Sequence, residues 1–342
     1  MIEETHQQPD RLVSPVADIE VNQFENTLRP KLLGEFVGQE NIKDNLKVSL
    51  SAAKKRGDCL DHILLHGSPG LGKTTLANVI AQEFGVGIKV TSGPALEKQG
   101  DLASIISNLQ VGDILFIDEI HRLKPVVEEV LYTAMEDFGI DIVIGKGPSA
   151  RTVRINLPKF TLIGATTKVS MLSAPLRGRF GNIFKLQFYT HEEICEIIKR
   201  SSKLLGIEVE HKAADLLAKS SRQTPRIANR LLKRVRDYTE FKNFEVIEEG
   251  LVKDALHKLG IDQMGLDQTD REILATIIDK FNGGPVGLNT LSAATSEEQE
   301  TIEDIYEPFL IQLGLLERTA RGRLVTESAY KHLGKVKNQP LR

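Results

Sequence analysis

The sequence predicts an α/β fold built on a mainly parallel sheet, followed by an all-helical segment and a winged-helix unit. Three observations support this prediction. Over residues 28–187, short apolar runs alternate with helical patterns, which is typical of βαβ units. Over residues 188–260, the apolar residues follow helical spacing. Over residues 261–335, three helical stretches precede two strand-like runs, the order of elements in a winged helix.

In the first segment, each expected strand is a short apolar run, and the expected helices carry apolar residues at helical spacing. The expected strands are residues 63–66, 88–90, 113–117, 160–165 and 183–186. The expected helices are residues 74–84, 102–109 and 125–138. Residues 139–158 break this order, because alternate residues are apolar on both sides of a turn rich in Gly and Pro. That pattern predicts an inserted β-hairpin.

The same patterns predict the remaining elements. Four helices are expected at residues 194–205, 213–219, 225–238 and 248–259, and a polar linker at 261–268. The last segment has expected helices at 269–281, from 289 and at 297–313, then strands at 315–318 and 323–326. Residues 1–27 are polar and contain Pro9 and Pro15, so we expect a mobile tail there and a short C-terminal tail at 336–342.

The composition narrows the class of protein. The chain has 342 residues, 41% of them hydrophobic and 27% charged, which excludes a disordered or collagen-like chain. Its net charge of −3 means that any nucleic-acid contact must come from a local basic patch. Cys59 and Cys195 exclude a disulfide scaffold, have no partner at metal-ligand spacing, and are interpreted as incidental. With no signal peptide and no membrane-spanning run, a cytoplasmic protein is expected.

The strongest functional motif is Gly67-Ser68-Pro69-Gly70-Leu71-Gly72-Lys73-Thr74, which lies between an expected strand and an expected helix. It matches the G-x-x-x-x-G-K-[ST] phosphate loop. Gly70 and Gly72 let backbone N–H groups turn toward phosphates, and the helix N-terminus adds a favourable dipole. Lys73 can reach the β- and γ-phosphates, and Thr74 can hold Mg²⁺. The motif therefore predicts binding of ATP with Mg²⁺.

A pair of acids, Asp118-Glu119, follows the apolar strand Ile114-Leu115-Phe116-Ile117. At the carboxyl end of a buried strand beside the phosphate loop, Asp118 would hold Mg²⁺ through water. Glu119 would orient and deprotonate the attacking water. The alternative is a strand that ends in solvated acids. His121 nearby is interpreted as a helix-start or solvated residue.

Together with Gly164-Ala165-Thr166-Thr167 on a later strand, these residues resemble the AAA+ ATPases. The resemblance implies that Thr167 touches the γ-phosphate or the lytic water. It also implies that Arg179, in Pro175-Leu176-Arg177-Gly178-Arg179-Phe180, reaches the ATP of a neighbouring subunit. The alternatives are that Thr167 merely closes a strand and that Arg177 and Arg179 are a solvated pair.

The same resemblance implies further nucleotide contacts. Arg226 matches the second-sensor arginine of a helical lid, and Tyr189 with Leu28-Arg29 matches the positions that line the adenine pocket. The remaining positions implied in this way are Thr75, Glu136, Asp137 and Phe138.

The resemblance is closer to one AAA+ family, the RuvB branch-migration motors, from about residue 28 to residue 333. It rests on five segments, several of which lie outside the shared ATPase machinery. They are Thr91-Ser92-Gly93-Pro94, the run from Asp118 to Leu123, Ile144-Gly145-Lys146-Gly147-Pro148-Ser149, the run from Gly283 to Leu288, and the run from Arg318 to Arg323. Membership implies a homohexamer that translocates double-stranded DNA at a four-way junction with the partners RuvA and RuvC. Ser68, Gln223 and Thr133 depart from the family pattern, which puts rates in doubt rather than the reaction.

The inserted hairpin places Ile140, Ile142 and Ile144 on one face of a strand. By the resemblance, this hairpin docks RuvA. The alternative is that these isoleucines belong to the core.

The expected wing carries Arg318, Arg321 and Arg323 within six residues. Three arginines on a hairpin suit contact with the phosphates of duplex DNA, without sequence preference. The alternative is a solvated charged loop. On the helix face of Arg226, Arg230 and Arg234, only Arg226 is interpreted as functional.

Two other functions compete with the motor. An AAA+ origin-binding or loader protein would share the fold and use ATP as an assembly switch, but the inserted hairpin favours the motor. A nucleotide-dependent transcription regulator would have no use for a water-activating carboxylate, so Glu119 and Arg179 argue against it.

Overall fold

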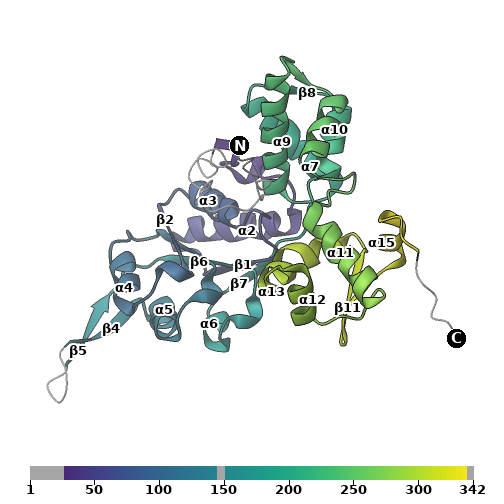
Figure 1. The fold of residues 1–342 in the computed structure, drawn as a ribbon. Helices are drawn as coiled ribbons and strands as arrows, with labels where there is room; N and C mark the ends of the chain where they lie inside the picture. The colour runs from purple at the N-terminus through teal and green to yellow at the C-terminus, as the bar shows by residue number, and fades with distance from the viewer. Residues whose placement is uncertain (1–26, 145–150, 337–342) are drawn as a thin grey trace, which may run out of the picture.

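The computed structural model describes residues 27–144 and 151–336, in which an α/β part, a helical part and a winged helix follow one another (Figure 1). The α/β part is built on a five-stranded sheet in the order β2-β3-β6-β1-β7, and every pair of neighbours is parallel. This confirms the expected parallel sheet. The strands are β1 (Ile63–His66), β2 (Ile88–Ser92), β3 (Ile114–Asp118), β6 (Thr161–Thr166) and β7 (Asn182–Lys185).

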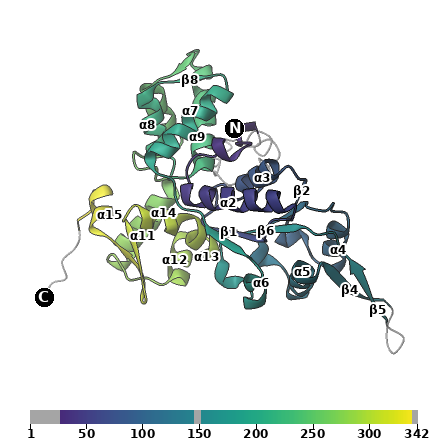
Figure 2. The ribbon, with the colours of Figure 1, turned by 180° about the vertical axis from the view of Figure 1, so that it is seen from behind.

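Helices cover both faces of this sheet (Figures 1 and 2). One face carries α2 (Glu40–Arg56) and α3 (Lys73–Phe84). The other carries α4 (Gln99–Ser107), α5 (Pro125–Asp137) and α6 (Ala174–Gly178). Successive residues of a strand point to opposite faces, so Ile63 and Leu65 of β1 enter the first core and Leu64 enters the second. Burial on both faces explains why the central strands are continuous apolar runs.

Helix α2 was missed in the sequence analysis, although the sequence contains a signal for it. Ile42, Leu46, Leu50 and Ala53 recur at helical spacing and are buried against α3 and the sheet. The helix ends at Gly57, whose φ of 67° is the left-handed conformation that glycine adopts at helix C-termini.

The inserted hairpin consists of β4 (Gly139–Ile144) and β5 (Arg151–Asn156), which pair antiparallel and project from the α/β part, away from the other two parts (Figures 1 and 2). Its turn, residues 145–150, lies outside the described residues. Ile140 is only 2% exposed and packs in the core beside α5, so the expectation that it docks a partner is wrong. The reason is that β4 starts at Gly139, directly after α5, so its first side chain still lies over the core that α5 covers. The structure describes the backbone of Ile142 and Ile144 but not their side chains.

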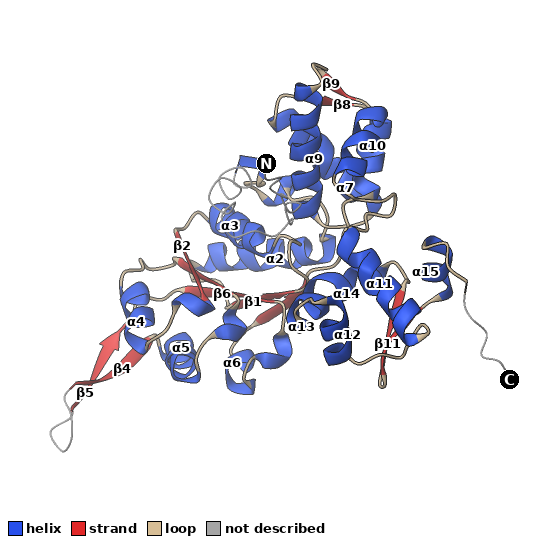
Figure 3. Cartoon of the chain, in the orientation of Figure 1, coloured by secondary structure: helices blue, strands red, loops and turns tan. Residues whose placement is uncertain are grey.

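The helical part contains α7 (His191–Leu204), α8 (His211–Lys219), α9 (Pro225–Phe241) and α10 (Glu249–Lys258). Helix α7 begins at Thr190 in a capping box, in which Thr190 Oγ1 accepts from Glu193 N and Glu193 Oε2 accepts from Thr190 N. The sequence predicts only helices here, but the helical part also contains strands. Two short strands, β8 (Glu208–Val209) and β9 (Val246–Ile247), pair in parallel at its far end (Figure 3).

The winged helix contains α11 (Gln268–Phe281), α12 (Leu288–Thr295), the antiparallel strands β10 (Leu316–Thr319) and β11 (Gly322–Val325), and a final α15 (Glu327–His332) that the sequence analysis did not anticipate. A separate apolar core holds these elements together. Among the described residues, no helix is both long enough and apolar enough to cross a membrane.

The helix expected at residues 297–313 is not continuous. It is divided into α13 (Gln299–Thr301), a π-helical turn at Ile302–Tyr306, and α14 (Glu307–Gln312). Pro308 explains the change, because it has no N–H to donate to the carbonyl four residues earlier and its ring crowds that turn. The backbone widens instead, and Glu307 N donates to Ile302 O, five residues earlier.

The prediction that Arg323 contacts DNA requires its side chain to face solvent, and in the structure it does not. It is 7% exposed, and its Nε and Nη2 atoms donate to Glu307 Oε2 at 3.0 and 2.7 Å. Its backbone also pairs with Val286, so β11 is held on both sides. The prediction for Arg323 is therefore wrong, because its guanidinium neutralises a carboxylate that is 2% exposed. Arg318 and Arg321 are exposed.

We expect Arg323→Ala to destabilise the winged helix by about 3–5 kcal/mol, because it leaves the Glu307 carboxylate buried without its main partner. Hydrogen exchange of the β10 and β11 amides in the full chain would measure this. Arg321→Ala, on the same hairpin but exposed, is the matched control and should change protection by less than about 0.5 kcal/mol. Equal effects of the two substitutions would show that the buried ion pair does not hold the wing.

Candidate nucleotide site

The carboxyl ends of β1, β3 and β6 meet at one edge of the sheet. His66 of β1 lies beside Thr166 of β6, and Ile117 of β3 lies beside Gly164 of β6. Since parallel strands end at the same edge, the phosphate loop, the Asp118-Glu119 pair and the Thr166-Thr167 pair come together. They line a cleft of about 330 Å³ between the α/β part and the helical part.

The phosphate loop requires glycine at three positions, the first being Gly67, whose β-carbon would lie 2.7 Å from Leu186 O. Gly70 and Gly72 have φ values of 79° and 98°, which side-chain-bearing residues rarely adopt. A β-carbon on Gly70 would also lie 2.8 Å from Thr224 Cγ2 and 3.2 Å from Arg226 Cβ. The helical part therefore packs directly against the loop. Gly72 immediately precedes α3, so the N-terminus of that helix opens onto the loop.

Lys73 is buried in this loop. Its Nζ donates to the backbone carbonyls of Gly67 at 2.8 Å and Ser68 at 3.0 Å. Burial lowers the pKa of Lys73 to about 8, although the charge of Asp118 acts in the opposite direction. Because Ser68 takes part through its backbone, its departure from the family pattern leaves this contact unchanged.

Thr74 and Asp118 form a pair of oxygen donors. Thr74 Oγ1 lies 3.4 Å from Asp118 Oδ2, while Asp118 Oδ1 accepts from Glu119 N at 2.9 Å. A hydroxyl and a carboxylate oxygen so close together fit Mg²⁺, which prefers hard oxygen ligands.

Glu119 has a left-handed backbone, with φ 48° and ψ 43°. Strained backbone of this kind is concentrated at functional sites. A β-carbon on Gly93 would lie 2.4 Å from Glu119 O, so the turn at Glu119 fits only against a glycine. The side chain is half exposed at the cleft, where its Oε2 accepts from Arg122 Nη1 at 3.0 Å.

Thr166 and Thr167 both line the cleft. Thr166 Oγ1 lies 2.9 Å from His121 Nδ1 and accepts from Lys168 N at 2.9 Å. His121 lies in the short helical turn Ile120–Arg122, as the helix-start interpretation implies, and it is not a fully solvated residue; its partial burial lowers its pKa. The histidine links the segment after β3 to the end of β6.

The other side of the cleft is formed by segments that are distant in the sequence. Leu28, Arg29, Thr75, Tyr189 and Arg226 all line it, together with the phosphate loop and the strand ends. Several lining residues were not predicted from the sequence, namely Pro30, Glu35, Phe36, Val37, Ser92, Ile197, Arg200 and Asn229. Ser92 belongs to the segment Thr91-Ser92-Gly93-Pro94, but the others belong to no motif, since only the fold brings them to the phosphate loop.

Two hydrogen bonds hold this side in place. Arg200 Nη1, on α7, donates to Leu28 O at 2.7 Å, and Tyr189 OH donates to Leu71 O in the phosphate loop at 3.1 Å. Burial raises the pKa of Tyr189, so its hydroxyl stays protonated as a donor. The helical part is thus attached both to the segment that begins at Leu28 and to the phosphate loop.

Four residues implied as nucleotide contacts do not line the cleft of their own chain. Arg179 forms an ion pair with Glu136. Asp137 pairs with Arg154 at 3.4 Å, and Phe138 packs edge-on against Phe160 with ring centroids 6.0 Å apart. These residues lie around the end of α5, apart from the residues of the cleft.

Gln223, which departs from the pattern that the resemblance implies, adopts a left-handed backbone conformation at a cost in free energy. Its φ is 50°, a left-handed value that glycine adopts freely and that costs other residues about 1–2 kcal/mol. Gln223 O accepts from Tyr189 N at 3.1 Å, and Gln223 Oε1 accepts from Gln312 Nε2 at 3.2 Å. These contacts offset part of the strain and link the helical part to the winged helix.

The comparisons with known proteins agree along the chain. Residues 28–186 match the Holliday junction DNA helicase RuvB P-loop domain, residues 189–262 the RuvB AAA lid domain, and residues 263–334 the RuvB C-terminal winged helix domain. The Holliday junction branch migration complex subunit RuvB of Dehalococcoides mccartyi is 56% identical over 327 residues, which cover 96% of this chain and 94% of that protein. The protein of the same name from Chloroflexus aurantiacus is 54% identical over 325 residues, covering 95% and 93%.

A solved structure agrees with these matches. The Thermotoga maritima RuvB Holliday junction branch migration motor superimposes with a TM-score of 0.83 at 53% identity, covering 91% of this chain and 99% of that one. With its P-loop domain, lid and winged helix each matched, the chain belongs to the RuvB family of P-loop branch-migration motors.

Proposed function

We propose that this chain is an ATP-hydrolysing motor that translocates duplex DNA and thereby moves four-way junctions. The observation that carries the proposal is the meeting of the phosphate loop, Asp118-Glu119 and Thr166-Thr167 in one cleft that the lid also lines. The names of its relatives, which refer to a Holliday junction branch migration complex, support the same function. The proposal includes a homohexamer that works with RuvA and RuvC.

In this proposal five residues of the cleft carry out the binding and hydrolysis of ATP. Lys73 would exchange the carbonyls of Gly67 and Ser68 for phosphate oxygens of ATP, and Thr74 would hold Mg²⁺ together with Asp118, which would act through water. The metal ion supplies positive charge that neutralises the phosphates. Glu119 would orient the attacking water and take its proton, and Thr167 would touch the γ-phosphate or that water.

Arg179 acts on a neighbouring subunit. It lies outside its own cleft, and its ion pair with Glu136 holds it at the end of α5. A second copy in a ring would meet this edge of the molecule, so Glu136, Asp137 and Phe138 would contact the neighbour's nucleotide beside Arg179. This arrangement makes hydrolysis depend on assembly.

Contacts between the parts support a route from the nucleotide to the DNA-binding domain. Lys168, next to Thr167, pairs with Asp304 of the winged helix at 3.0 Å. Arg222, four residues before Arg226, pairs with Asp267 at 2.7 Å and also with Asp270. A change at Thr167 or at Arg226 would therefore displace the winged helix. The wing of that domain would hold DNA through Arg318 and Arg321.

The hairpin is the proposed docking site for RuvA. Val153 and Ile155 of β5 are 43% and 36% exposed, and they lie opposite Ile142 and Ile140 in the register. Large apolar side chains that stay exposed on a projecting hairpin are typical of an interaction surface. Ile142 and Ile144 remain in this proposal, while the buried Ile140 does not.

The decisive experiment measures two activities together: ATP turnover with and without duplex DNA, and branch migration of a synthetic four-way junction with RuvA present. The proposed motor should show DNA-stimulated turnover and move the junction. Turnover without junction movement would favour a loader, and DNA binding without turnover would favour a transcription regulator.

Glu119→Gln should retain ATP binding and lose hydrolysis by about 10²- to 10⁴-fold, because Lys73 and Thr74 remain while the water loses its base. Steady-state turnover and nucleotide binding by equilibrium dialysis would measure both. Glu245→Gln, an exposed carboxylate of the lid, is the control and should keep full turnover. Near-normal turnover in the Glu119 variant would contradict its assigned role.

Arg179→Ala should reduce turnover by about 10³-fold while leaving nucleotide binding in place. Mixing it with Lys73→Ala should restore part of the turnover, because in a mixed ring an intact cleft can face an intact arginine. The measurement is ATPase activity against mixing ratio, with native mass spectrometry to verify mixed assemblies. Mixed rings without any recovery would show that Arg179 does not act across subunits.

Arg318→Ala combined with Arg321→Ala should weaken duplex binding equally for unrelated sequences. The slope of log affinity against log salt should fall by roughly 0.9 for each phosphate that the wing no longer neutralises. A salt titration of DNA affinity measures the slope. The charge-matched control is Lys55→Ala with Arg56→Ala, two exposed cations at the end of α2. If both double variants gave the wild-type slope, DNA would be held elsewhere.

A further inference from the structure

We propose that the lid contains a binding site for a zinc-class divalent cation, formed by His191, Cys195 and Asp215. This inference does not rest on the proposed motor function, because none of the three residues lines the nucleotide cleft. It corrects the interpretation of Cys195 as a residue without partners at metal-ligand spacing.

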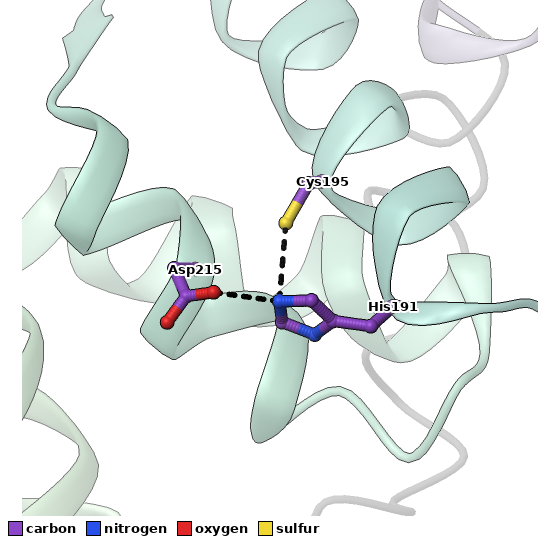
Figure 4. Close-up of side chains that lie close together, drawn as sticks. All are labelled: His191, Cys195 and Asp215. Carbon is purple, nitrogen blue, oxygen red and sulfur yellow. Dashed lines mark hydrogen bonds and ion pairs between the residues drawn. The ribbon is translucent and has the colours of Figure 1, made fainter.

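The three residues are brought together by two adjacent helices. His191 and Cys195 are separated by one turn of α7 and so lie on the same face of that helix, and Asp215 comes from α8, which packs against it. Their three donor atoms, one nitrogen, one sulfur and one oxygen, all lie within 4.8 Å of one another. Figure 4 shows the imidazole of His191 between the thiol and the carboxylate, with one ring nitrogen facing both.

The distances are close to those of a tetrahedral site. His191 Nε2 lies 3.6 Å from Cys195 Sγ and 2.6 Å from Asp215 Oδ1. Bond lengths of about 2.0–2.1 Å to nitrogen and oxygen and about 2.3 Å to sulfur place tetrahedral N and S ligands roughly 3.6 Å apart, and N and O ligands roughly 3.3 Å apart. The N–S pair is thus already at ligand spacing, the N–O pair must widen by roughly 0.7 Å, and the S–O separation is no more than 4.8 Å.

The carboxylate is already oriented by a second partner. Asp215 Oδ2 accepts from Lys219 Nζ at 2.6 Å, which leaves Oδ1 directed at the histidine. An outer partner of this kind fixes a ligating carboxylate and is a common part of metal sites. The cation would replace the hydrogen that Nε2 and Oδ1 share, and it would lie off the line between these two atoms, on the side of Cys195 Sγ.

The chemistry of the donors selects the ion. A set of thiolate, imidazole and carboxylate suits Zn²⁺, whereas Mg²⁺ and Ca²⁺ require oxygen ligands. On binding, the Cys195 thiol loses its proton to solvent, and the Nε2 proton moves to Nδ1 or to solvent. His191 and Asp215 have side chains 34% and 36% exposed, so an ion can enter and water can complete the fourth position.

The test uses the full chain, stripped of metal and free of nucleotide, with Zn²⁺ as the probe. Dialysis against micromolar Zn²⁺ followed by elemental analysis should give one ion per chain. Cys195→Ser should weaken binding by more than about 100-fold, and Cys59→Ser, which removes the other thiol, should leave it unchanged. Asp215→Asn, nearly the same shape as the native side chain, should also weaken binding, and circular dichroism verifies that each variant is folded.

A second measurement needs no substitution. Mass spectrometry after brief iodoacetamide treatment reports the modification of Cys195 and Cys59 in the same molecules. Zn²⁺ should slow modification of Cys195 at least tenfold and leave Cys59 unaffected. The proposal is overturned if no ion binds, if binding is the same in Cys195→Ser and Cys59→Ser, or if Zn²⁺ protects neither or both cysteines equally.

Discussion

The parallel hydrogen bonding of β1, β3 and β6 is the constraint on which the rest of the molecule depends. It forces three strand ends to one edge of the sheet, and the residues that follow those ends become the phosphate loop, the acidic pair and the threonine pair. The strands can pair in this way because alternate side chains fill two separate cores, one on each face. The cleft is therefore a consequence of how the sheet is buried.

The second level of organisation is the attachment of the lid and the winged helix to this edge. Gly70 allows the segment Thr224–Arg226 to pack against the loop, and Arg222, just before that segment, is buried among Asp267, Asp270 and the ring of Phe309. A buried guanidinium with two carboxylates requires well-defined geometry, because each charge has lost its water. The winged helix is thus held close to the part of the lid that faces the nucleotide.

Charged residues of one type have different roles in this chain according to their burial. Arg321 is exposed on the wing, whereas Arg323, two residues away, neutralises a buried glutamate. Similarly, Cys59 and Cys195 are alike in the sequence, but only Cys195 meets a histidine and a carboxylate. Residue type and spacing could not distinguish the members of either pair, because the difference lies in partners that come from other elements.

By itself, the sequence was sufficient to predict the parallel α/β sheet, the hairpin, the phosphate loop and the Asp118-Glu119 pair, because each depends on local periodicity or on a contiguous motif. The tertiary structure alone decided which residues of α7 and of the segment after Leu28 form the far wall of the cleft. It also decided that Ile140 and Arg323 are buried. These outcomes depend on contacts between residues far apart in the chain, and such contacts leave no periodic pattern in the sequence.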